Sequence, residues 1–407
     1  MTNARAFLLL VLVFAPFSLA ARDAAAGEFD LSGFVAFETR YFPNAPLFAG
    51  QGSAELSPSV VAEPEFVYEW NRRKDRLTFV PFARFDADDD RRTHADIREA
   101  NWLHIGDGWD LVVGFERIFW GVTESRHLVD IINQFDGVED VDDEDKLGQP
   151  MVNFRLQEDW GTLSAFVLPG FRERTFVDDD ARLRGPLPID DDDPTYDSAA
   201  GEAHVDVALR WSRTIGDWDI GLSHFHGTSR EPRLIPTLRP TGEVVLVPHY
   251  DQIDQSGLDL QWTMEAWLWK LETMTRSGHG KRFVASVAGV EYTLYQLFET
   301  VYDLGLLAEY QYDGRDKANA PFTPADGDLF LGMRLALNDV QSTEALAGAS
   351  FDRTSEAVLF FVEAERRISD HYKVELEGRF NFNAKNDVLL SNIREDDFLT
   401  LRLSRYF

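Results

Sequence analysis

Residues 397–407 read DFLTLRLSRYF, and this stretch decides the fold class. Apolar and polar side chains alternate along it. One side carries Leu399, Leu401, Leu403 and Phe407. The other side carries Thr400, Arg402, Ser404 and Tyr406. Because successive side chains of a β-strand point to opposite faces, a period of two with one apolar face indicates a half-buried strand. The stretch therefore predicts a sheet whose two faces meet different environments.

Residues 372–383, YKVELEGRFNFN, repeat this alternation with a fully charged or amide-bearing second face. A chain that ends on an aromatic residue inside such a strand resembles the C-terminal signal of bacterial outer-membrane β-barrels. The resemblance implies that Leu399, Leu401, Leu403 and Phe407 form an assembly signal for periplasmic chaperones and the barrel-assembly machinery. An amphipathic edge strand of a soluble protein is the alternative.

The other end of the chain has the features of a secretory signal peptide. Arg5 precedes an apolar stretch at 7–19, and Ser18-Leu19-Ala20 matches a small-residue cleavage site, with a second candidate after Ala26. We expect a signal peptide at 1–20, an N-terminal periplasmic segment at 21–28 and a single outer-membrane barrel at 29–407. The chain has no cysteine, so a disulfide or a thiolate metal site is excluded, and we expect neither a cofactor nor a bound metal.

Composition narrows the class further. The net charge of -30 argues against nucleic-acid binding, which requires a basic face. No later stretch approaches the roughly 20 consecutive apolar residues of a membrane helix, yet aromatic residues make up 13% of the chain. A transmembrane barrel accommodates both facts, because only every second strand residue faces lipid.

Alternating segments separated by turns predict an all-β fold, a transmembrane antiparallel up-and-down β-barrel of about 18 strands, with 16 as the alternative. The predicted strands are 29–42, 65–71, 77–86, 96–105, 109–119, 151–158, 162–169, 204–214, 218–227, 258–264, 267–276, 283–294, 301–312, 329–337, 345–351, 358–366, 371–383 and 398–407. Short turns and long loops alternate, so the long loops fall at one end. A barrel with short periplasmic turns and long extracellular loops predicts this asymmetry.

Several short turns place an aromatic residue beside glycine or aspartate: Trp109, Trp160, Trp218 and Tyr372. Aromatic residues at such positions are typical of the girdle at a membrane interface. Pro81 interrupts an otherwise regular strand and predicts a bulge there or a shifted register.

The loop at 120–150 is the third long connection. In trimeric general porins the third long loop folds inward and narrows the pore, and the similar order here implies the same arrangement, although a surface loop over the barrel mouth is an alternative. The loop contains a helix-compatible apolar run at 127–135. Mixed donors and acceptors at a constriction select ions or small polar solutes. The predicted pore-lining residues are Glu116, Glu124, Arg126, His127, Asp130, Asn133, Gln134, Arg155, Arg210, Glu265, Glu309, Arg334, Glu375 and Arg379.

Residues 114–136, GFERIFWGVTESRHLVDIINQFD, are similar to a stretch in proteobacterial barrels related in style to the alginate-export porins. The mixed, slightly acidic lumen departs from the basic lumen that an acidic polymer favours. The sequence thus predicts an outer-membrane channel for ions or small polar solutes that leans toward cations, and not an enzyme. A rim-active hydrolase and a plugged barrel with a scaffold or adhesion role are the alternatives. Expected partners are outer-membrane lipid and lipopolysaccharide, and a homotrimer is possible.

Overall fold

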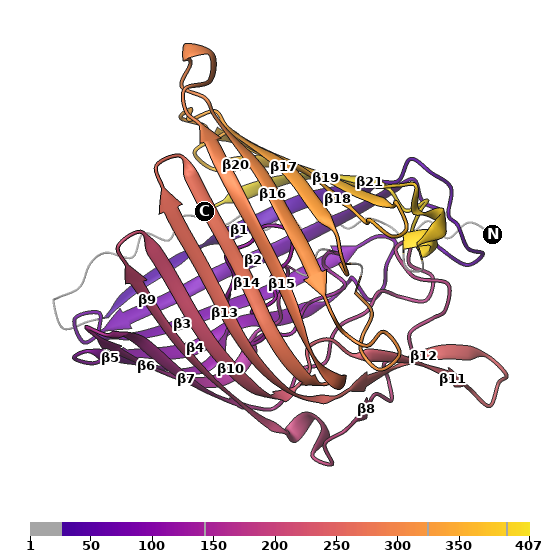
Figure 1. Cartoon of the computed structure of the whole chain (residues 1–407), viewed down its shortest axis with the longest axis horizontal. Helices are drawn as coiled ribbons and strands as arrows, with labels where there is room; N and C mark the ends of the chain where they lie inside the picture. Colours follow the sequence, from indigo (N-terminus) through magenta and orange to yellow (C-terminus); the bar gives the residue numbers. More distant parts are fainter. Residues whose placement is uncertain (1–26, 142–143, 324, 388–389) are drawn as a thin grey trace.

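A computed structural model describes residues 27–407 apart from 142–143, 324 and 388–389. The expected signal peptide at 1–20 and most of the segment at 21–28 therefore lie outside the described residues. Eighteen antiparallel strands form one sheet in which each strand pairs with its neighbours along the chain, and β21 pairs back onto β1. The chain is thus an all-β, closed up-and-down barrel (Figure 1), as the alternation predicts.

The barrel strands are β1 (Glu28–Tyr41), β2 (Leu56–Trp70), β3 (Asp75–Asp86), β4 (Ala95–Ile105), β5 (Trp109–Glu116), β6 (Gln149–Glu158), β7 (Gly161–Pro169), β9 (Val205–Ile215), β10 (Trp218–Thr228), β13 (Gln252–Met264), β14 (Trp267–Gly278), β15 (Gly280–Leu294), β16 (Asp303–Asp313), β17 (Leu329–Ala336), β18 (Glu344–Phe351), β19 (Val358–Ser369), β20 (Tyr372–Phe382) and β21 (Phe398–Tyr406). Each corresponds to one predicted strand. The largest difference is β2, which begins nine residues before the predicted start at 65, because Pro58 and Pro64 hide it in the sequence. Both prolines are nevertheless paired in register with β1.

The seam of the barrel is the ladder between the first and last strands. The register runs from Phe34 opposite Tyr406 to Tyr41 opposite Leu399, and the backbone N–H of Phe407 donates to the Gly33 carbonyl at 3.1 Å. This ladder joins the first strand to the last and closes the barrel. Closure removes both sheet edges, so no row of backbone N–H and C=O groups is left unpaired at the seam.

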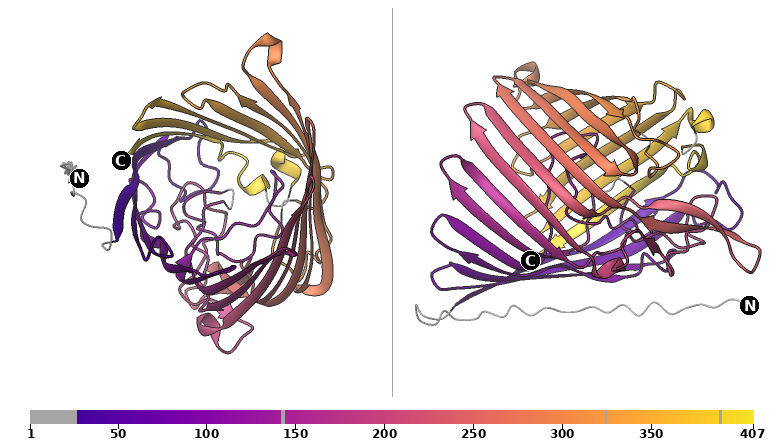
Figure 2. Two further views of the ribbon diagram at one scale, coloured as in Figure 1. Left: turned by 90° about the vertical axis from the view of Figure 1, so that its left-hand side faces the viewer. Right: turned by 60° about the horizontal axis from the view of Figure 1, so that its bottom comes forward.

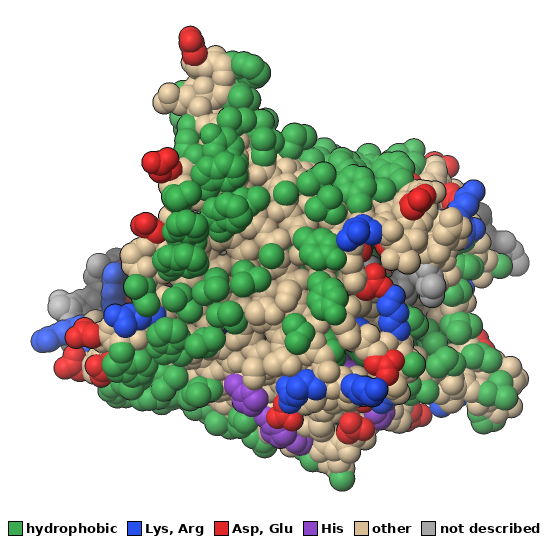
Figure 3. All heavy atoms as spheres, in the orientation of Figure 1, with side chains coloured by type: hydrophobic (Ala, Val, Ile, Leu, Met, Phe, Trp, Pro, Cys, Tyr) green, Lys and Arg blue, Asp and Glu red, His purple; other side chains and the backbone are tan. Residues whose placement is uncertain are grey.

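The outer wall is apolar. Along β21, Leu401 and Leu403 are 50% and 41% exposed, whereas Thr400 and Ser404, on the other face of the strand, are buried. Figure 3 shows such side chains spread over the wall, with charged groups gathered toward the barrel ends. Apolar side chains thus face outward and polar side chains face inward, which is the reverse of a water-soluble protein. Large exposed apolar surfaces mark contact with a membrane or a partner.

The two barrel ends differ. We call the end that carries the connections 42–55, 117–148, 170–204, 229–251 and 383–397 the loop rim, and the opposite end the turn rim. The predicted asymmetry holds for these long loops, with one exception in the pattern: β14 and β15 meet at the loop rim through His279 alone. At the turn rim Trp218 stacks on Trp262 at 5.0 Å, and Trp267 contacts Tyr292 at 4.5 Å. Aromatic rows of this kind suit a membrane interface.

Pro81 lies at a bulge, as predicted. The ladder between β3 and β4 shifts register between Val80, opposite Glu99, and Pro81, opposite Ile97. Proline has no N–H to donate, so it is accommodated where one residue drops out of the ladder.

A small second sheet at the loop rim was not predicted. It comprises β8 (Thr195–Tyr196), β11 (Arg233–Leu238) and β12 (Val244–Tyr250), all within segments expected to be irregular loops. Figure 1 shows the β11–β12 hairpin extending beyond the barrel wall. The four short 3-10 helices of the described chain are η1 (Gly201–Ala203), η2 (Leu297–Glu299), η3 (Ala384–Asn386) and η4 (Leu390–Asn392). No helix in the described ranges is long and apolar enough to cross a membrane.

Candidate functional site: an acidic cavity beside a loop in the lumen

The described part of the connection between β5 and β6, residues 117–141 and 144–148, lies inside the barrel; we call it the lumen loop. In the end-on view of Figure 2, irregular chain occupies the interior that the strands surround. The lumen loop contacts strands on several sides of the barrel. Its partners include Arg40 on β1, Glu272 on β14 and Glu309 on β16. The expectation that this loop folds inward agrees with these contacts.

The middle of the lumen loop is apolar and packs against part of the inner wall. Trp120, Val129, Ile131 and Ile132 form one buried cluster with wall residues of five strands: Met151, Phe166, Leu168, Ala208, Phe225 and Ile253. Leu128 joins a second cluster with Met274, Phe283, Ala285 and Val287. Burial of this apolar surface holds the loop to one side of the lumen.

The run at 127–135 is not helical, contrary to its helix-compatible pattern. Its backbone groups are satisfied by side chains instead of by neighbouring turns. Glu272 Oε2 accepts the N–H of Val129 at 3.2 Å, and Asn133 bonds the Ile118 N–H and the carbonyls of Glu116 and Leu147. Side chains that bond backbone groups in this way compete with helical hydrogen bonds.

Two wall carboxylates hold the start of the lumen loop. Glu272 Oε1 accepts the N–H groups of Val122 and Thr123 at 2.7 and 3.1 Å. Glu309, on β16, accepts the N–H groups of Glu124 and Ser125 at 2.9 and 2.8 Å. Hydrogen bonds to an ionised acceptor are stronger than neutral ones, so these contacts fix the loop across the wall of β14–β16.

Ion pairs add to this attachment. Arg334 on β17 contacts Glu124 at 2.6 Å, and Arg126 contacts Asp313 at 3.1 Å. His127 lies 3.8 Å from Glu272 and packs edge-on against Phe119. Burial lowers the pKa of His127, but the hydrogen bond and negative charge of Glu272 outweigh it, so the pKa lies above its usual value.

Three predicted pore residues are buried within the lumen loop and do not reach open space. Asp130 pairs with Lys146 and is 6% exposed, Asn133 is 1% exposed, and Gln134 is fully buried against the Arg172 carbonyl. The polar groups of these residues form ion pairs and hydrogen bonds that stabilise the loop. Glu265 does not line the pore: β13 ends at Met264, and Glu265 follows in the turn between β13 and β14 at the turn rim, with a φ of 53°.

Seven further residues of the predicted set form two groups, one on the inner wall and one around a cavity. Glu116, Arg155 and Arg210 bond neighbouring wall side chains, namely Asn153, Asp110 and Asp259. The second group lines a cavity of about 540 Å³ between the lumen loop and the wall. Its members from the predicted set are Glu124, Arg334, Glu375 and Arg379.

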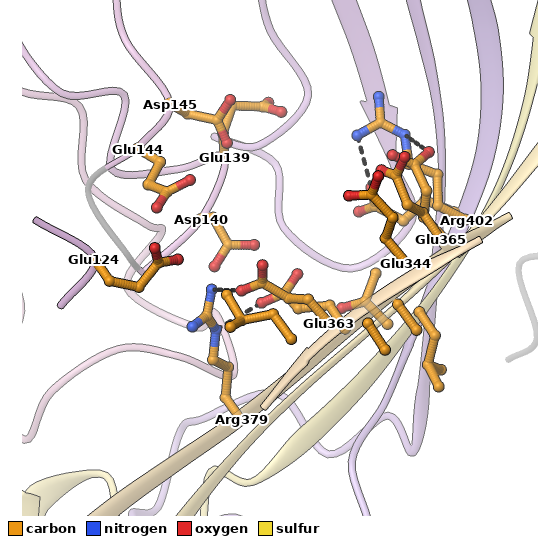
Figure 4. Close-up of a pocket in the computed structure, with 18 of the residues that line it drawn as sticks. Glu124, Glu139, Asp140, Glu144, Asp145, Glu344, Glu363, Glu365, Arg379 and Arg402 are labelled. Carbon is orange, nitrogen blue, oxygen red and sulfur yellow. Dashed lines mark hydrogen bonds and ion pairs between the residues drawn. The ribbon is translucent and has the colours of Figure 1, made fainter. Parts of the chain in front are cut away.

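The cavity is strongly acidic. Eleven carboxylates line it against five guanidinium groups. The carboxylates are Glu38, Glu124, Glu139, Asp140, Glu144, Asp145, Glu344, Glu363, Glu365, Glu375 and Glu377. Figure 4 shows the loop acids Glu124, Asp140 and Glu144 facing the strand acid Glu363, with Arg379 beside it.

The carboxylate of Glu38 on β1 is neutralised by two arginines, Arg84 and Arg92, which it contacts at 2.8 and 2.7 Å. The glutamates of β18–β20 instead face one another across neighbouring strands, and we call them the acid ladder. On the wall, Glu344 is directly opposite Glu365, which is opposite Glu375. Like charges directly opposite each other destabilise a sheet. Lys373 relieves part of this repulsion by contacting Glu365 and Glu375 at 2.7 and 2.9 Å, but Glu344 forms no ion pair with any described residue.

Alternate positions along β19 and β20 place Glu363, Glu365, Glu375 and Glu377 on the inward face, but Glu38 and Glu344 were missed. Both lie on the face of their strand opposite to apolar residues, so counting alternate positions was the available signal. No such signal was present for the loop acids Glu139, Asp140 and Asp145, because side chains of an irregular loop do not alternate between two faces with a fixed period. Burial raises the pKa of Asp145 to about 6, and the charges of Glu139 and Asp140 contribute to the rise.

Comparisons with known proteins give likenesses of structure only. No protein-family model and no curated protein sequence matches the chain. Among solved structures, a variant of the porin of Rh. blastica is similar with a TM-score of 0.45 and 12% identity, covering 93% of this chain and all of that one. OmpT, an outer membrane protein of Vibrio cholerae described as a trimer form, is similar with a TM-score of 0.47 and 10% identity, covering 94% of this chain and all of that one. The porin-type fold of this chain rests on its own strand pairing.

Proposed function

We propose that the chain forms a passive, cation-preferring diffusion channel for ions or small polar solutes in the bacterial outer membrane. The single observation that carries the proposal is the acid ladder on β18–β20, where Glu344, Glu365 and Glu375 lie side by side in the lumen. The repulsion within it costs folding free energy, and mobile cations in the lumen relieve that cost.

The membrane location is supported by the outer wall and by the amino-terminal sequence. Exposed apolar side chains cover the strands, and aromatic side chains gather at the turn rim. The proposal includes export through the signal peptide at 1–20 and assembly by chaperones and the barrel-assembly machinery. It also includes contacts with lipid and lipopolysaccharide and a homotrimeric state.

Single-channel recording in planar bilayers under a salt gradient tests it, because the reversal potential reports the ratio of cation to anion permeability. We expect a cation-selective reversal potential for the wild-type protein. The triple variant Glu344→Gln, Glu363→Gln, Glu365→Gln is expected to lower that ratio at least about twofold, since it removes three lumen charges. The matched control neutralises Asp190, Asp191 and Asp192, which lie at the loop rim outside the cavity lining. Anion selectivity of the wild type, or equal effects of both triple variants, contradicts the proposal.

A plugged barrel is the second candidate, and the apolar packing of the lumen loop favours it. Trp120, Val129 and Ile132 fill one side of the lumen as a packed core does. A protein that is folded, heat-modifiable on gels and silent in the bilayer would identify it. A rim-active hydrolase would need a histidine beside a carboxylate, and the pairs that are close in sequence are His94 with Asp96 and His127 with Asp130. Instead, His94 contacts Asp136 at 3.3 Å, and the carboxylate of Asp130 is paired with Lys146.

A further inference from the structure

Three aspartates meet at the loop rim, where the β16–β17 connection lies beside the β18–β19 turn. Asp326 and Asp328 end the connection between β16 and β17, and Asp352 begins the turn between β18 and β19. The ladder pairs Leu329 with Phe351, so the residues just beyond this pair, Asp328 and Asp352, are brought together by the register of the sheet. One oxygen from each of the three carboxylates lies within 4.8 Å of the others.

Two other groups of acidic and histidine side chains have comparable geometry, but arginines already neutralise them. Asp251, near Asp197 and His249, accepts two hydrogen bonds from Arg233 at 2.7 and 2.6 Å. Asp136 and Glu139, near His94, contact Arg98 and Arg84 at 2.7 and 2.5 Å. A cation bound there would displace or repel a guanidinium group, so neither group suits a metal ion.

The Asp326–Asp328–Asp352 group has no arginine partner among the described residues. Its single ion pair joins Asp326 to Lys317, whose side chain is 70% exposed. Asp328 is 4% exposed, and its Oδ1 is buried without a hydrogen-bond partner. A buried carboxylate oxygen without a donor is costly, because the group has lost its water and gained nothing in return.

The electrostatics of Asp328 agree with this geometry. Burial, together with the negative charges of Asp352 and Asp326, raises the pKa of Asp328 to about 7. Asp387, in the connection between β20 and β21, adds to the same negative field. A small metal cation that accepts several oxygen ligands would offset the negative charge of this group.

We propose that Asp326, Asp328 and Asp352 bind one divalent cation, and that this cation is Ca²⁺. Calcium takes six to eight oxygen ligands in flexible geometry, whereas Mg²⁺ demands near-ideal octahedral geometry. Carboxylates on two irregular connections meet the first requirement better than the second. The ion ties the β16–β17 connection to the β18–β19 turn at the loop rim. This site is separate from the acidic cavity, so its test is independent of channel activity.

Calcium titration of the in-vitro folded barrel tests the site. The protein is held in zwitterionic detergent without lipopolysaccharide, in about 0.15 M NaCl to screen diffuse binding to its acidic surface. Equilibrium dialysis with CaCl₂ is expected to show one saturable ion for the wild type. Asp328→Asn is expected to weaken its binding at least tenfold, while the control Asp192→Asn, at an exposed aspartate of an acidic run, leaves it unchanged. A wild type without a saturable ion, or an Asp328→Asn variant that binds as the wild type does, overturns the proposal.

A second measurement uses the wild-type protein alone and therefore decides the matter even if the variants fail to fold. Lys317 is an exposed trypsin site within the connection that the ion restrains. We expect CaCl₂ to slow cleavage after Lys317 at least about fivefold, and MgCl₂ at equal concentration to slow it far less. Equal protection by both salts, or none by CaCl₂, contradicts a calcium site here. Asp352→Asn, checked for heat-modifiable migration, is expected to abolish the calcium effect.

Discussion

Glu272 on β14 accepts hydrogen bonds from both the backbone N–H and the hydroxyl group of Thr123, at 3.1 and 2.8 Å. The two residues are far apart in the chain, and their contact joins the lumen loop to the barrel wall. The same carboxylate also receives the N–H of Val129, so one side chain organises both ends of a loop segment. The free volume of the lumen depends on this attachment, because the cavity lies between the loop and the opposite wall.

Glu272→Gln is therefore expected to loosen the lumen loop. The amide keeps one acceptor oxygen but turns a donor toward a backbone N–H, and the loss of a charged hydrogen bond costs about 1.5–3 kcal/mol. Single-channel traces of the variant should show larger current fluctuations than the wild type. Glu291→Gln on β15 is the matched control, since Glu291 contacts Lys270 and not the loop. Equal noise in both variants would mean that Glu272 does not restrain the loop.

The cation preference is expected to fall as the pH is lowered through about 6. The pKa of Asp145 is raised to about 6 by burial and by its acidic neighbours, so its carboxylate is charged above that pH and neutral below it. Protonation removes one negative charge from the cavity lining. Reversal potentials measured between pH 5 and 7 check this. Asp145→Asn should flatten the part of the profile centred near pH 6, and an unchanged profile in that variant would count against Asp145 as its source.

Leu401→Arg on the outer face of β21 is expected to lower stability in the membrane. Leu401 is 50% exposed on the apolar wall, and a lipid-facing arginine at the midplane costs about 2–4 kcal/mol. Urea unfolding of the barrel in lipid vesicles measures the difference. Leu401→Met preserves volume and polarity, so it should unfold nearly as the wild type does. A loss of less than about 0.5 kcal/mol for the arginine variant would place this face outside the lipid.

The candidate site was only partly predictable. Glu124, Arg334, Glu375 and Arg379 line the cavity as the sequence analysis expected of pore residues. Asp130, Asn133 and Gln134 have the same polar character, but they are consumed in the fold of the lumen loop. Composition does not distinguish these two outcomes. A polar side chain in an irregular loop either bonds the loop backbone or faces the lumen, depending on where the chain turns.

The sequence by itself determined the barrel. Alternation with a period of two is a local property, so it identified all eighteen strands and their apolar outer face. Only the tertiary structure decided what fills the lumen. The apolar run at 128–132 packs against strands that are distant in the chain, the acids of β18–β20 align through cross-strand register, and Asp328 meets Asp352 across a ladder. These contacts join residues of unrelated sequence position, and no local pattern encodes them.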